Sequence, residues 1–553
     1  MEKPLEERAT ATWRVLGVEL PVGESDAALR ARVCRDLGLA PDELRGLRVV
    51  HKALDARTRA GERRLRFVIH ADLVLDARVR GRAFSRARKS GRVVAVPPPA
   101  TGLLPNVHAS FARTPARQIA VIGAGPAGIF AAWVLARHGV RVLLVDRGAP
   151  VERRSRDVVA FQRTRQPNPE SNLLFGEGGA GTFSDGKLYT RVADALEVPI
   201  LEELVRCGAP AEITFDSRAH IGTDKLHRIL PRLRARLEEL GTQFHWNTRL
   251  ERLVLSDDRK RVRALDTTCG EIPCDGVVLA PGHSARDTWA RLFEQGVAVE
   301  SKPFQLGVRV EHPQELVTTG RHGTSVAAQT LGPASYQLVC RAEDGLLAAH
   351  TFCMCPGGRI VASVSEHGFL CTNGMSNSKH SSRYANAAVV VTLGPNDFGA
   401  GPFDGVQFQR ELEARFFDAG GSDYTAPAQR VPDFLARRAS SGELTSSYRF
   451  GARAGRIDEL LPARVHASIA RALLRFDRSI PGFAGASGLI VGIESRSSGP
   501  VRLPRDAETL RARGFENLWP VGEGAGYAGG IMSAALDGAR AALAVLAVGV
   551  PPA

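Results

Sequence analysis

A glycine-rich turn near residue 120 constrains the fold of this chain more than any other feature of the sequence. Residues 118–122 form a short apolar run that predicts a strand, the turn from Gly123 to Gly128 follows at once, and residues 129–138 predict a helix. A second apolar strand, at residues 140–145, ends at Asp146. In such a unit the first glycine forms the tight turn, the second admits a pyrophosphate to the backbone, and the third lets helix and strand pack closely. Because all the parts fall in order, the pattern predicts a dinucleotide site rather than a chance glycine turn.

The carboxylate that ends the second strand completes this unit. Asp146 lies about 20 residues beyond the turn, where an acid can accept hydrogen bonds from both ribose hydroxyls of an adenosine. The helix N-terminus presents free amides that favour phosphate. The unit does not by itself distinguish FAD from NAD(P). We assign these cofactor-binding residues to it: Gly123, Gly125, Pro126, Ala127, Gly128, Asp146, Arg147 and Arg154.

A second motif, near the C-terminus, separates the two dinucleotides. Residues 518–521 predict a strand, Glu523 lies in a glycine loop, and a helix follows to Leu546. The alternative is a buried helix that merely begins with a glycine-rich turn. It leaves Glu523 unexplained, because an acid is costly to bury without a partner. The arrangement resembles the C-terminal flavin motif of FAD oxidoreductases with a glutathione-reductase type of FAD domain. There the acid bonds the ribityl chain, and the helix start, with about half an elementary positive charge, faces the flavin. The residues assigned here are Gly522, Glu523, Gly529, Gly530, Ile531 and Met532.

A loop between these motifs is also rich in glycine. From Gly176 to Gly186 five of eleven residues are glycine, which lets the backbone lie flat against a ligand. We expect this loop to cradle the pyrophosphate and the flavin. Lys187 has three interpretations: a contact to flavin N5 or O4, a contact to an anionic substrate, or a solvated residue of a surface turn. The cofactor-binding residues assigned to the loop are Gly178, Gly179, Ala180, Gly181, Thr182, Ser184 and Lys187.

The segment that follows predicts one amphipathic helix and three strands. The helix covers residues 223–241, and the strands cover residues 243–255, 261–267 and 276–280. This order resembles the segment on the adenine side of such FAD domains, which leaves the main sheet and whose last strand returns to it under the cofactor. We therefore add Leu250 and Gly282 to the cofactor-binding residues. His283 follows the last strand, either near the flavin as a group that titrates near neutral pH or as a loop residue bonded locally.

The chain as a whole resembles an FAD-dependent dehydrogenase family of poorly assigned function, which occurs in bacteria and plant plastids and has an N-terminal α+β extension. The matching pieces span almost the full length: Leu54-Asp-Ala-Arg57, the loop from Asn172 to Leu188, Lys302-Pro-Phe304, Glu311-His-Pro-Gln314, Thr351-Phe-Cys-Met-Cys-Pro-Gly-Gly358, Thr372-Asn-Gly-Met-Ser376, Tyr424-Thr-Ala-Pro-Ala-Gln-Arg430 and Glu494-Ser-Arg496. One departure is Phe450, where the family pattern leads us to expect proline. The resemblance implies bound FAD and a redox role, and it implies no particular substrate.

Residues 301–483 hold most of the unusual polar motifs, and we expect them to form an inserted α+β substrate domain over the flavin. Four residues are candidates for catalysis: Lys187, Arg496, Cys353 and Cys355. The two cysteines exchange electrons only if they are exposed and of low pKa, and otherwise are small buried residues on alternating strand faces. Arg496 either binds a carboxylate of the substrate or pairs with Glu494 or another acid. Further candidates to line the pocket are Glu366, His367, Asn373, Met375, Tyr424 and Gln429.

The N-terminal part predicts a separate module. Residues 13–20, 47–53 and 65–75 predict strands, and a helix begins after Ser25-Asp26 and ends near Gly38. We expect a small ferredoxin-like α+β module over residues 1–95, whose end is marked by the basic stretch 78–92, and then a linker over residues 96–117 that contains Pro97-Pro-Pro99. Residues 1–118 hold 23 Lys and Arg against 13 Asp and Glu. This excess indicates a solvated arginine-rich surface or, as an alternative, a surface that attracts RNA or another anion.

The predicted fold class is therefore α/β. A Rossmann-like FAD-binding domain of the glutathione-reductase type, built from residues 118–300 and 484–553, carries the inserted domain and the N-terminal module. We expect FAD to be bound non-covalently, because neither flavin motif contains His or Cys. The sequence has no second Gly-x-Gly-x-x-Gly after a strand, so we expect no dedicated NAD(P)H domain. We expect NAD(P)H, oxygen, a quinone or a protein to serve as a transient electron partner.

The predicted function is hydride transfer between an unidentified small molecule and flavin N5. The alternatives are an FAD-dependent monooxygenase, a flavoprotein that binds or acts on RNA, and a flavin-holding protein without catalysis. Eight cysteines without framework spacing, no secretory leader and no long apolar stretch predict a cytoplasmic protein with reduced thiols and no membrane span. Cys353-Met-Cys355 lacks the further ligands of a zinc site, so we predict no metal.

Overall fold

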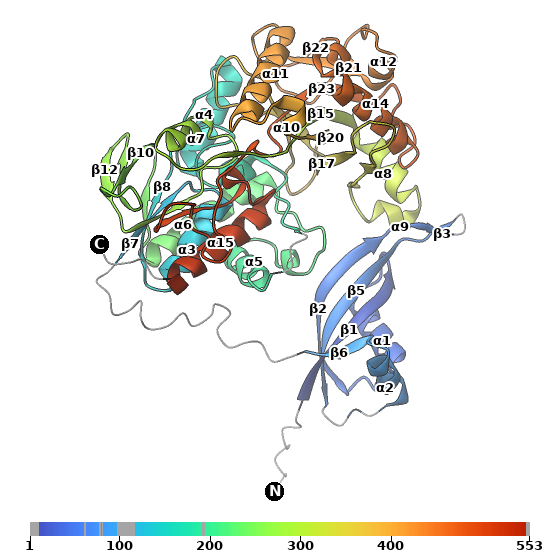
Figure 1. The fold of residues 1–553 in the computed structure, drawn as a ribbon. Coiled ribbons are helices and arrows are strands. Elements are labelled where there is room, and N and C mark those ends of the chain that lie inside the picture. Colours follow the sequence, from blue (N-terminus) through green and yellow to red (C-terminus); the bar gives the residue numbers. More distant parts are fainter. Residues whose placement is uncertain are drawn as a thin grey trace.

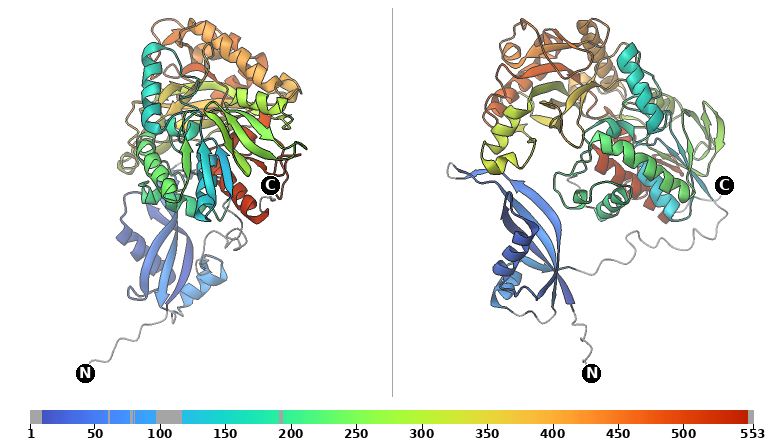
Figure 2. Two further views of the ribbon diagram at one scale, coloured as in Figure 1. Left: turned by 90° about the vertical axis from the view of Figure 1, so that its left-hand side faces the viewer. Right: turned by 180° about the vertical axis from the view of Figure 1, so that it is seen from behind.

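The computed structural model describes residues 10–59, 62–76, 79, 81–96, 117–190 and 194–548. Figure 1 shows an N-terminal module below a larger body, and the two views of Figure 2 show the same division. Apart from its two end residues, the predicted linker over residues 96–117 lies outside the described residues, and so does Pro97-Pro-Pro99. No helix of the described residues is long and apolar enough to cross a membrane.

The N-terminal module is a four-stranded antiparallel sheet with two helices. Its elements are β1 (Thr10–Pro21), α1 (Asp26–Leu37), β2 (Leu44–Asp55), a small hairpin of β3 (Thr58–Arg59) and β4 (Glu62–Arg63), β5 (Arg66–Asp76), α2 (Arg82–Lys89) and β6 (Val93–Ala95). The strands lie in the order β2-β5-β1-β6. Ser25 caps α1 by accepting a hydrogen bond from the amide of Ala28, and Gly38 ends the helix at a φ of 63°. Both predicted helix signals are thus confirmed.

The basic stretch 78–92 does not mark the end of the module, which corrects the sequence-based interpretation. It contains helix α2, and β6 then adds the fourth strand of the sheet. Phe84 and Ala87 are buried on the inner face of α2, whereas the intervening Arg and Lys side chains are mostly exposed. The sequence interpretation predicted no helix here, because this stretch has only two apolar contact residues, Phe84 and Ala87, among many charged ones.

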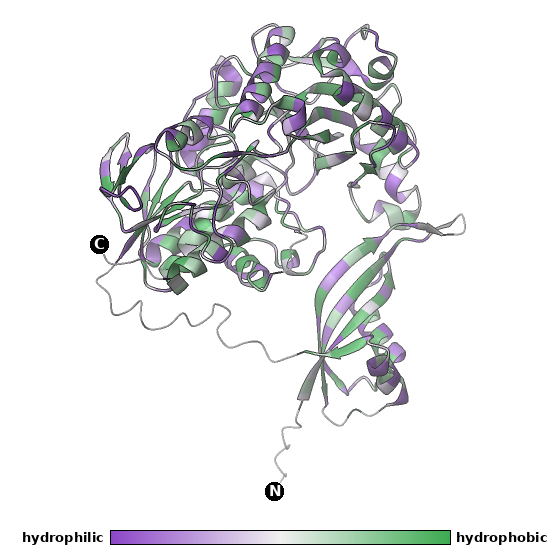
Figure 3. Ribbon diagram, viewed as in Figure 1, coloured by the Kyte–Doolittle hydropathy of each residue, from purple (hydrophilic) through white to green (hydrophobic). Residues whose placement is uncertain are grey.

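The second part is a five-stranded parallel sheet with helices on its faces. Its strands are β7 (Gln118–Ile122), β8 (Arg141–Val145), β9 (Gln243–His245), β13 (Gly276–Leu279) and β25 (Leu518–Pro520), in the spatial order β25-β13-β7-β8-β9. This is the order of a doubly wound dinucleotide-binding sheet. Helices α3 (Pro126–Arg137) and α15 (Ile531–Val548) pack together in a core beside this sheet, and both are largely hydrophobic in Figure 3. The Rossmann-like fold is confirmed.

The remaining elements of this part complete its periphery. Their bounds are α4 (Val151–Thr164), α5 (Glu197–Arg206), α6 (Thr223–Glu239), β10 (Leu250–Leu255), β11 (Val262–Thr267), β12 (Gly270–Pro273) and α7 (Arg286–Glu294). The predicted single strand over residues 243–255 is wrong, because β9 belongs to the parallel sheet and β10 belongs to the antiparallel sheet β10-β11-β12. Asn247, with a φ of 54°, breaks the strand between them.

The inserted domain is built on a seven-stranded sheet. Its strands lie in the order β16-β17-β20-β15-β23-β21-β22, and the small sheets β14-β24 and β18-β19 lie beside it. The strand bounds are β14 (Glu300–Ser301), β15 (Phe304–Pro313), β16 (Val339–Cys340), β17 (Ala349–Cys355), β18 (Arg359–Ala362), β19 (Thr372–Met375), β20 (Tyr384–Leu393), β21 (Ala426–Arg430), β22 (Ala452–Ala454), β23 (Leu489–Glu494) and β24 (Val501–Arg502). The helix bounds are α8 (Gln314–His322), α9 (Val326–Gln329), α10 (Pro395–Phe398), α11 (Asp404–Gly420), α12 (Val431–Leu435), α13 (Ile457–Leu460) and α14 (Ala463–Asp477).

The boundary predicted between residues 483 and 484 falls inside this domain. Strand β23 pairs with β15 and β21 in the seven-stranded sheet, and β24 pairs with β14. The chain therefore returns to the FAD domain only after β24, about twenty residues later than predicted. Phe450, where the family pattern suggested proline, is buried in an aromatic cluster with Phe161, Tyr424 and Tyr448.

Candidate functional site

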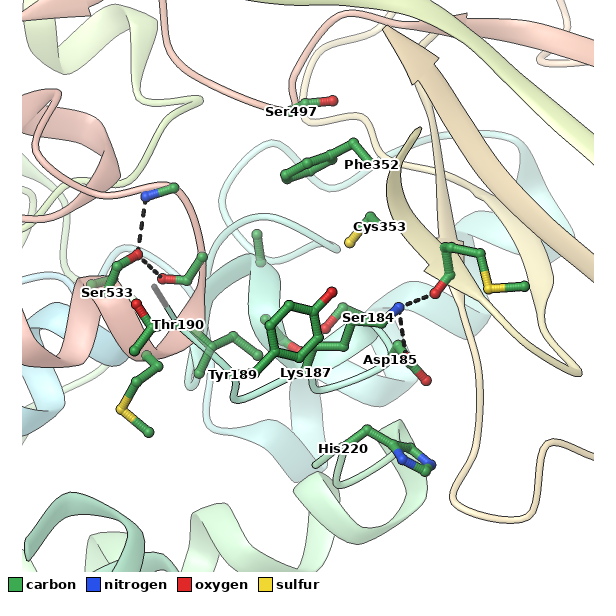
Figure 4. Close-up of a pocket in the computed structure, with 18 of the residues that line it drawn as sticks. Ser184, Asp185, Lys187, Tyr189, Thr190, His220, Phe352, Cys353, Ser497 and Ser533 are labelled. Carbon is green, nitrogen blue, oxygen red and sulfur yellow. Dashed lines mark hydrogen bonds and ion pairs between the residues drawn. The ribbon is translucent and has the colours of Figure 1, made fainter. Parts of the chain in front are cut away.

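One large cavity joins the three parts of the molecule. Its volume is about 1270 Å³, and it is lined by the glycine turn, the 174–190 loop, the 280–284 segment, the C-terminal motif, β17, the 331–339 segment and strands β2 and β5. Small-molecule sites are typically about 300–1,000 Å³. The cavity is thus large enough for a dinucleotide and a second molecule. Figure 4 shows the part around Lys187 and Cys353.

The glycine turn has the geometry that its spacing predicts. Gly123 has a φ of 101°, and a Cβ there would lie 2.2 Å from the carbonyl oxygen of Ala280. A Cβ at Gly128 would lie 1.8 Å from the carbonyl oxygen of Gly123, where α3 crosses the turn. A Cβ at Gly125 would meet only Gly179 Cα, at 3.8 Å. The first and third glycines therefore serve packing, and Gly125 leaves its space to the cavity.

Asp146 ends β8 at the cavity wall. Its two carboxylate oxygens accept hydrogen bonds from the amides of Ala124 and Gly148, each at 2.7 Å. The side chain is 7% exposed and lines the cavity. The two amides fix the carboxylate beside the glycine turn, in the place where the sequence predicts a ribose.

Arg154 and Arg147, two of the six predicted cofactor residues that do not line the cavity, bind other parts of the protein. The guanidinium of Arg154 is fully buried and donates to the carbonyl oxygens of Asn172, Glu177 and Gly179 at 2.6–2.8 Å, so Arg154 shapes the glycine loop from behind. Burial lowers its pKa to about 10. Arg147 forms ion pairs with Glu170 at 2.6 Å and Asp287 at 2.8 Å. Both arginines were assigned from their position after the ribose acid, and both act on the protein itself.

The other predicted cofactor residues divide in the same way. Gly128, Gly178, Thr182 and Leu250 do not line the cavity. A Cβ at Gly178 would lie 2.1 Å from Thr182 Oγ1, so these two residues build the loop. The residues that do line the cavity are Gly123, Gly125, Pro126, Ala127, Asp146, Gly179, Ala180, Gly181, Ser184, Lys187, Gly282, Gly522, Glu523, Gly529, Gly530, Ile531 and Met532.

Lys187 is a half-buried cation in the wall of the cavity. Its ammonium lies 2.8 Å from Asp185 Oδ2 and also donates to the carbonyl oxygen of Met354 in β17 (Figure 4). Burial opposes the charge, but Asp185 outweighs it and raises the pKa of Lys187 above its usual value. The lysine is therefore charged and held between the glycine loop and the inserted domain. The interpretation as a solvated surface residue is wrong.

Asp185 also lies near two histidines. The ligand atoms of Asp185, His220 and His380 are within 4.8 Å of one another, an arrangement able to hold a metal ion. Both oxygens of Asp185 already have partners, because Ser376 donates to Oδ1 and the Lys187 ammonium lies at Oδ2. We therefore interpret Asp185 as the acid of an ion pair with Lys187 that lies beside the two histidines. Burial lowers the pKa of His220, which favours its neutral form.

Glu523 also lines the cavity, at the start of the C-terminal glycine loop. Burial raises its pKa to about 7. Its Oε1 accepts a long hydrogen bond of 3.4 Å from the amide of Gly499, and Lys302 is the nearby cation that favours its charged form. A buried acid with only one long hydrogen bond is stabilised by a hydroxyl group that binds it. The sequence predicts that the ribityl chain supplies this hydroxyl group.

The two cysteines of the Cys353-Met-Cys355 motif differ in position. Cys353 lines the cavity, at a φ of 43° in an irregularity of β17, while Cys355 is fully buried behind it and donates to the carbonyl oxygen of Cys353 at 3.3 Å. Burial raises the pKa of both thiols. A redox-active pair requires the opposite shift, so this geometry favours the interpretation as small buried residues.

Arg496 lines the cavity, but an acid already binds its guanidinium. Nε and Nη2 lie 3.0 and 2.7 Å from the two carboxylate oxygens of Glu413, which also pairs with Arg286 at 2.8 Å. Glu413 is completely buried. Of the two interpretations, the structure favours a pair with another acid. That acid is Glu413, since Glu494 pairs with Arg309 at 3.3 Å.

The remaining candidates contribute unequally. Asn373 lines the cavity and accepts a hydrogen bond from Arg309 at 2.9 Å. His283 also lines it, burial lowers its pKa to about 4, and its Nδ1 is bonded locally to Ser284 at 2.9 Å. The candidates that do not line the cavity are Glu366, His367, Met375, Tyr424 and Gln429.

Sequence reasoning missed several lining residues. Lys52, Leu54 and Phe67 come from the N-terminal module, and Tyr189 and Tyr336 come from the body. The one available signal was the match of Leu54-Asp-Ala-Arg57 to the family pattern, which marked this short stretch without giving a reason. No periodicity places the end of a strand in the module against a loop more than a hundred residues away.

The cradle fits a flavin dinucleotide. Gly125 opens onto the cavity, the N-terminus of α3 has no side-chain cap to occupy its amides, and Asp146 and Glu523 stand at separate places on the wall. These donors match a pyrophosphate, a ribose and a ribityl chain. The fold and this site define an FAD-dependent oxidoreductase.

Comparison with known proteins agrees with this class. Residues 116–166 match the family described as FAD binding domain, and residues 303–497 match the family described as FAD-dependent protein, C-terminal domain-like. A curated protein of Clostridium beijerinckii (strain ATCC 51743 / NCIMB 8052), described as an uncharacterized protein, is 37% identical over 538 residues, which are 96% of this chain and 97% of the relative. The chain belongs to the same family as that protein.

Solved structures resemble this chain only distantly. The crystal structure of L-proline dehydrogenase from P. horikoshii has a TM-score of 0.33 and 11% identity, and the match covers 79% of this chain and 95% of that one. Glycine oxidase from Bacillus cereus ATCC 14579 has a TM-score of 0.30 and 10% identity, with 78% and 95% covered. Likenesses at this level carry no argument about substrate.

Proposed function

We propose that this protein transfers a hydride between a carbon of a small-molecule substrate and N5 of FAD. The observation that carries the proposal is the continuity of the cavity, which runs from the glycine cradle past Lys187 to a pocket lined by Tyr336, Phe352 and the N-terminal module. FAD supplies the redox chemistry when it is bound, and the protein supplies position and charge.

The chain's own residues divide this work. The glycine turn and Asp146 hold the dinucleotide end, and Tyr336 and Phe352 give the pocket beyond Lys187 an apolar wall that limits water at the reacting atoms. Lys187 carries a positive charge that Asp185 and the carbonyl oxygen of Met354 fix in place. A fixed, buried cation stabilises negative charge that develops beside it during the reaction.

The test is anaerobic reduction of the purified yellow protein. A panel of amino acids, hydroxy acids, amines and reduced nicotinamides is mixed with it, and the flavin absorbance is followed. We expect one class to bleach the flavin, and we expect Lys187→Met to slow this step by about tenfold or more, since removing one preorganised charge costs a few kcal/mol. Lys260→Met, at an exposed site of the adenine-side sheet, is the matched control. The proposal is contradicted if every compound of the panel reduces the flavin at the same rate in Lys187→Met as in Lys260→Met.

A monooxygenase is the second candidate. The observation in its favour is the match of residues 116–166 to an FAD-binding family that is typical of monooxygenases. Such an enzyme takes electrons from a reduced nicotinamide and places one oxygen atom in the substrate. Isotope-labelled oxygen in the product distinguishes it from a dehydrogenase, whose product contains none. Binding of RNA by the basic N-terminal module stays a prediction.

A further inference from the structure

The N-terminal module reaches the cavity through the far end of its sheet. Residues 50–55 of β2 and 66–70 of β5 form a ribbon that we call the arm, and in Figures 1 and 2 it extends from the module toward the body. Lys52 pairs with Ile69 and Leu54 pairs with Phe67 in the antiparallel register. These paired residues share one face of the ribbon.

The arm is joined to the body by backbone hydrogen bonds. The amide of Lys52 donates to the carbonyl oxygen of Phe215 at 2.8 Å, and the amide of Ser217 donates to the carbonyl oxygen of Lys52 at 3.0 Å. Strand β2 is the edge strand of its sheet, so its outer backbone groups are available for such a pairing. These two bonds fix the arm to the loop that leads to His220.

The side chains on this face complete the cavity wall. Lys52, Leu54 and Phe67 are half-buried and line the same cavity as Gly125 and Lys187. The Lys52 ammonium lies 4.3 Å from the centroid of the Phe67 ring. The arm therefore presents one cation and two apolar side chains to whatever occupies the outer half of the cavity.

The end of the arm is held rigid by Asp55. Its carboxylate accepts hydrogen bonds from Arg57 Nε at 2.8 Å and Nη2 at 2.9 Å, and Arg66 lies 3.5 Å away. Arg57 holds the pKa of Asp55 well below its usual range. These contacts tie the two strands together beside Leu54 and Phe67, so the apolar surface they form is built in advance of binding.

The charge on this wall has an aromatic neighbour, Phe67, but no ion pair among the described residues. Among the described residues no carboxylate forms an ion pair with Lys52 or with the neighbouring Arg218, whose side chain is exposed. Glu212 and Asp216 also line the cavity and are exposed; Asp216 is the backbone bridge partner of Lys52, but neither carboxylate forms an ion pair with the Lys52 ammonium. A half-buried ammonium over an aromatic ring thus remains available to an anion that enters the cavity.

We infer that the arm is the outer wall of the substrate pocket and that it selects an apolar molecule with one anionic group. Lys52 meets the anion, and Leu54 and Phe67 contact the apolar body, while the reacting carbon lies farther in, near Lys187. This inference rests on the proposed function, because it assumes that the substrate enters the cavity that holds FAD. It makes the N-terminal module part of the active site.

Two dyes of matched shape test this assignment. Anilinonaphthalenesulfonate is an apolar anion, and N-phenylnaphthylamine has the same aromatic skeleton without the sulfonate. Each is titrated into the oxidised, FAD-bound protein by equilibrium dialysis. We expect Lys52→Gln to weaken the anion by about tenfold and to leave the neutral dye unchanged, as expected for a lost charged hydrogen bond. We expect Phe67→Ala to weaken both dyes by about tenfold, because it removes an aromatic contact.

The matched control is Val68→Ala, since Val68 is the next residue of β5 and points to the other face of the sheet. FAD content and melting temperature verify that each variant is folded. The inference is overturned if the protein does not bind the anionic dye, if Lys52→Gln weakens both dyes equally, or if Val68→Ala acts like Phe67→Ala. Dye binding requires no electron transfer, so it fails or succeeds independently of flavin reduction by the metabolite panel.

Discussion

The two ends of the cavity are built in different ways. At the cofactor end the wall is formed by backbone. A Cβ at Gly125 would meet only Gly179 Cα, and two backbone amides hold the carboxylate of Asp146. At the arm end the wall is side chains, including Phe67 and Tyr336, that come from separate parts of the fold. A backbone wall fits one ligand whatever the neighbouring side chains are. A side-chain wall changes its ligand with each substitution, so the first end keeps the cofactor and the second end selects the substrate.

The ion pair that joins the inserted domain to the FAD domain beside the cavity gives the largest expected effect. Glu413 of α11 pairs with Arg286 of the FAD domain and with Arg496, and it is completely buried. Although burial opposes its charge, the two arginines hold the pKa of Glu413 well below its usual range. We expect Glu413→Ala to lower the free energy of unfolding by about 3–5 kcal/mol, because it leaves the buried guanidinium of Arg496 without an ion pair and Arg286 with only the longer pair to Glu366 at 3.4 Å.

Urea denaturation of the FAD-bound protein measures this loss. The control is Glu300→Ala, which removes the exposed pair with Arg513 at 3.3 Å and should cost less than about 1 kcal/mol. Equal losses in the two variants mean that the inserted domain and the FAD domain are not held together by this buried group.

Blocking the backbone wall is the next test. Gly125 has a φ of −77°, which leucine adopts without strain, and its Cβ would have room in the protein but not beside a cofactor. We expect Gly125→Leu to fold and to lose FAD, with affinity lower by up to about a hundredfold from about 1–3 kcal/mol of overpacking. Released flavin is measured by absorbance after denaturation. Gly394→Leu, where a Cβ meets nothing within 4 Å, is the control, and a fully yellow Gly125→Leu protein would contradict the cradle.

The same difference between the two ends explains what the sequence predicted. The turn from Gly123 to Gly128 and the loop at Glu523 were recognised because their glycine spacing is local and the same ligand geometry always requires it. The strand that follows Gly241 was predicted as one piece, because nothing in its apolar pattern reveals that Asn247 turns the chain into another sheet. Element boundaries of this kind depend on tertiary contacts that a local pattern does not contain.

The arm end was not predicted, for a physical reason. Lys52 and Phe215 are bonded through their backbones, and backbone bonds place no demand on residue type. Arg154 turned away from the cavity for a related reason, since it binds three backbone carbonyl groups that no sequence pattern marks. A residue that binds the chain and a residue that binds a cofactor differ only in which way the side chain turns.

A pH dependence is expected from the acid at the cofactor end. Burial raises the pKa of Glu523 to about 7, above the value of about 4.5 in the unfolded chain. The folded apoprotein therefore holds a proton that the unfolded chain releases, and its free energy of unfolding falls as pH rises between these two values. We expect Glu523→Gln to be more stable than the wild type by about 3 kcal/mol at pH 8, from a shift of about 2.5 pKa units at about 1.4 kcal/mol per unit, and not at pH 4. Urea titrations of the apoproteins at several pH values measure the difference in free energy of unfolding. A difference that does not change with pH contradicts a raised pKa of Glu523.

The smallest effect is expected at Cys353, and it decides whether the side-chain wall takes part in electron transfer. Burial raises the pKa of the Cys353 thiol, so at neutral pH the sulfur is protonated and a poor nucleophile. We expect Cys353→Ser to change the rate of flavin reduction by less than about twofold, in line with a substitution that alters no charge. The rate is followed by flavin absorbance with the reductant that the metabolite panel identifies. A loss of tenfold or more would mean that electrons pass through the thiol, and the outer wall would then do more than select the substrate.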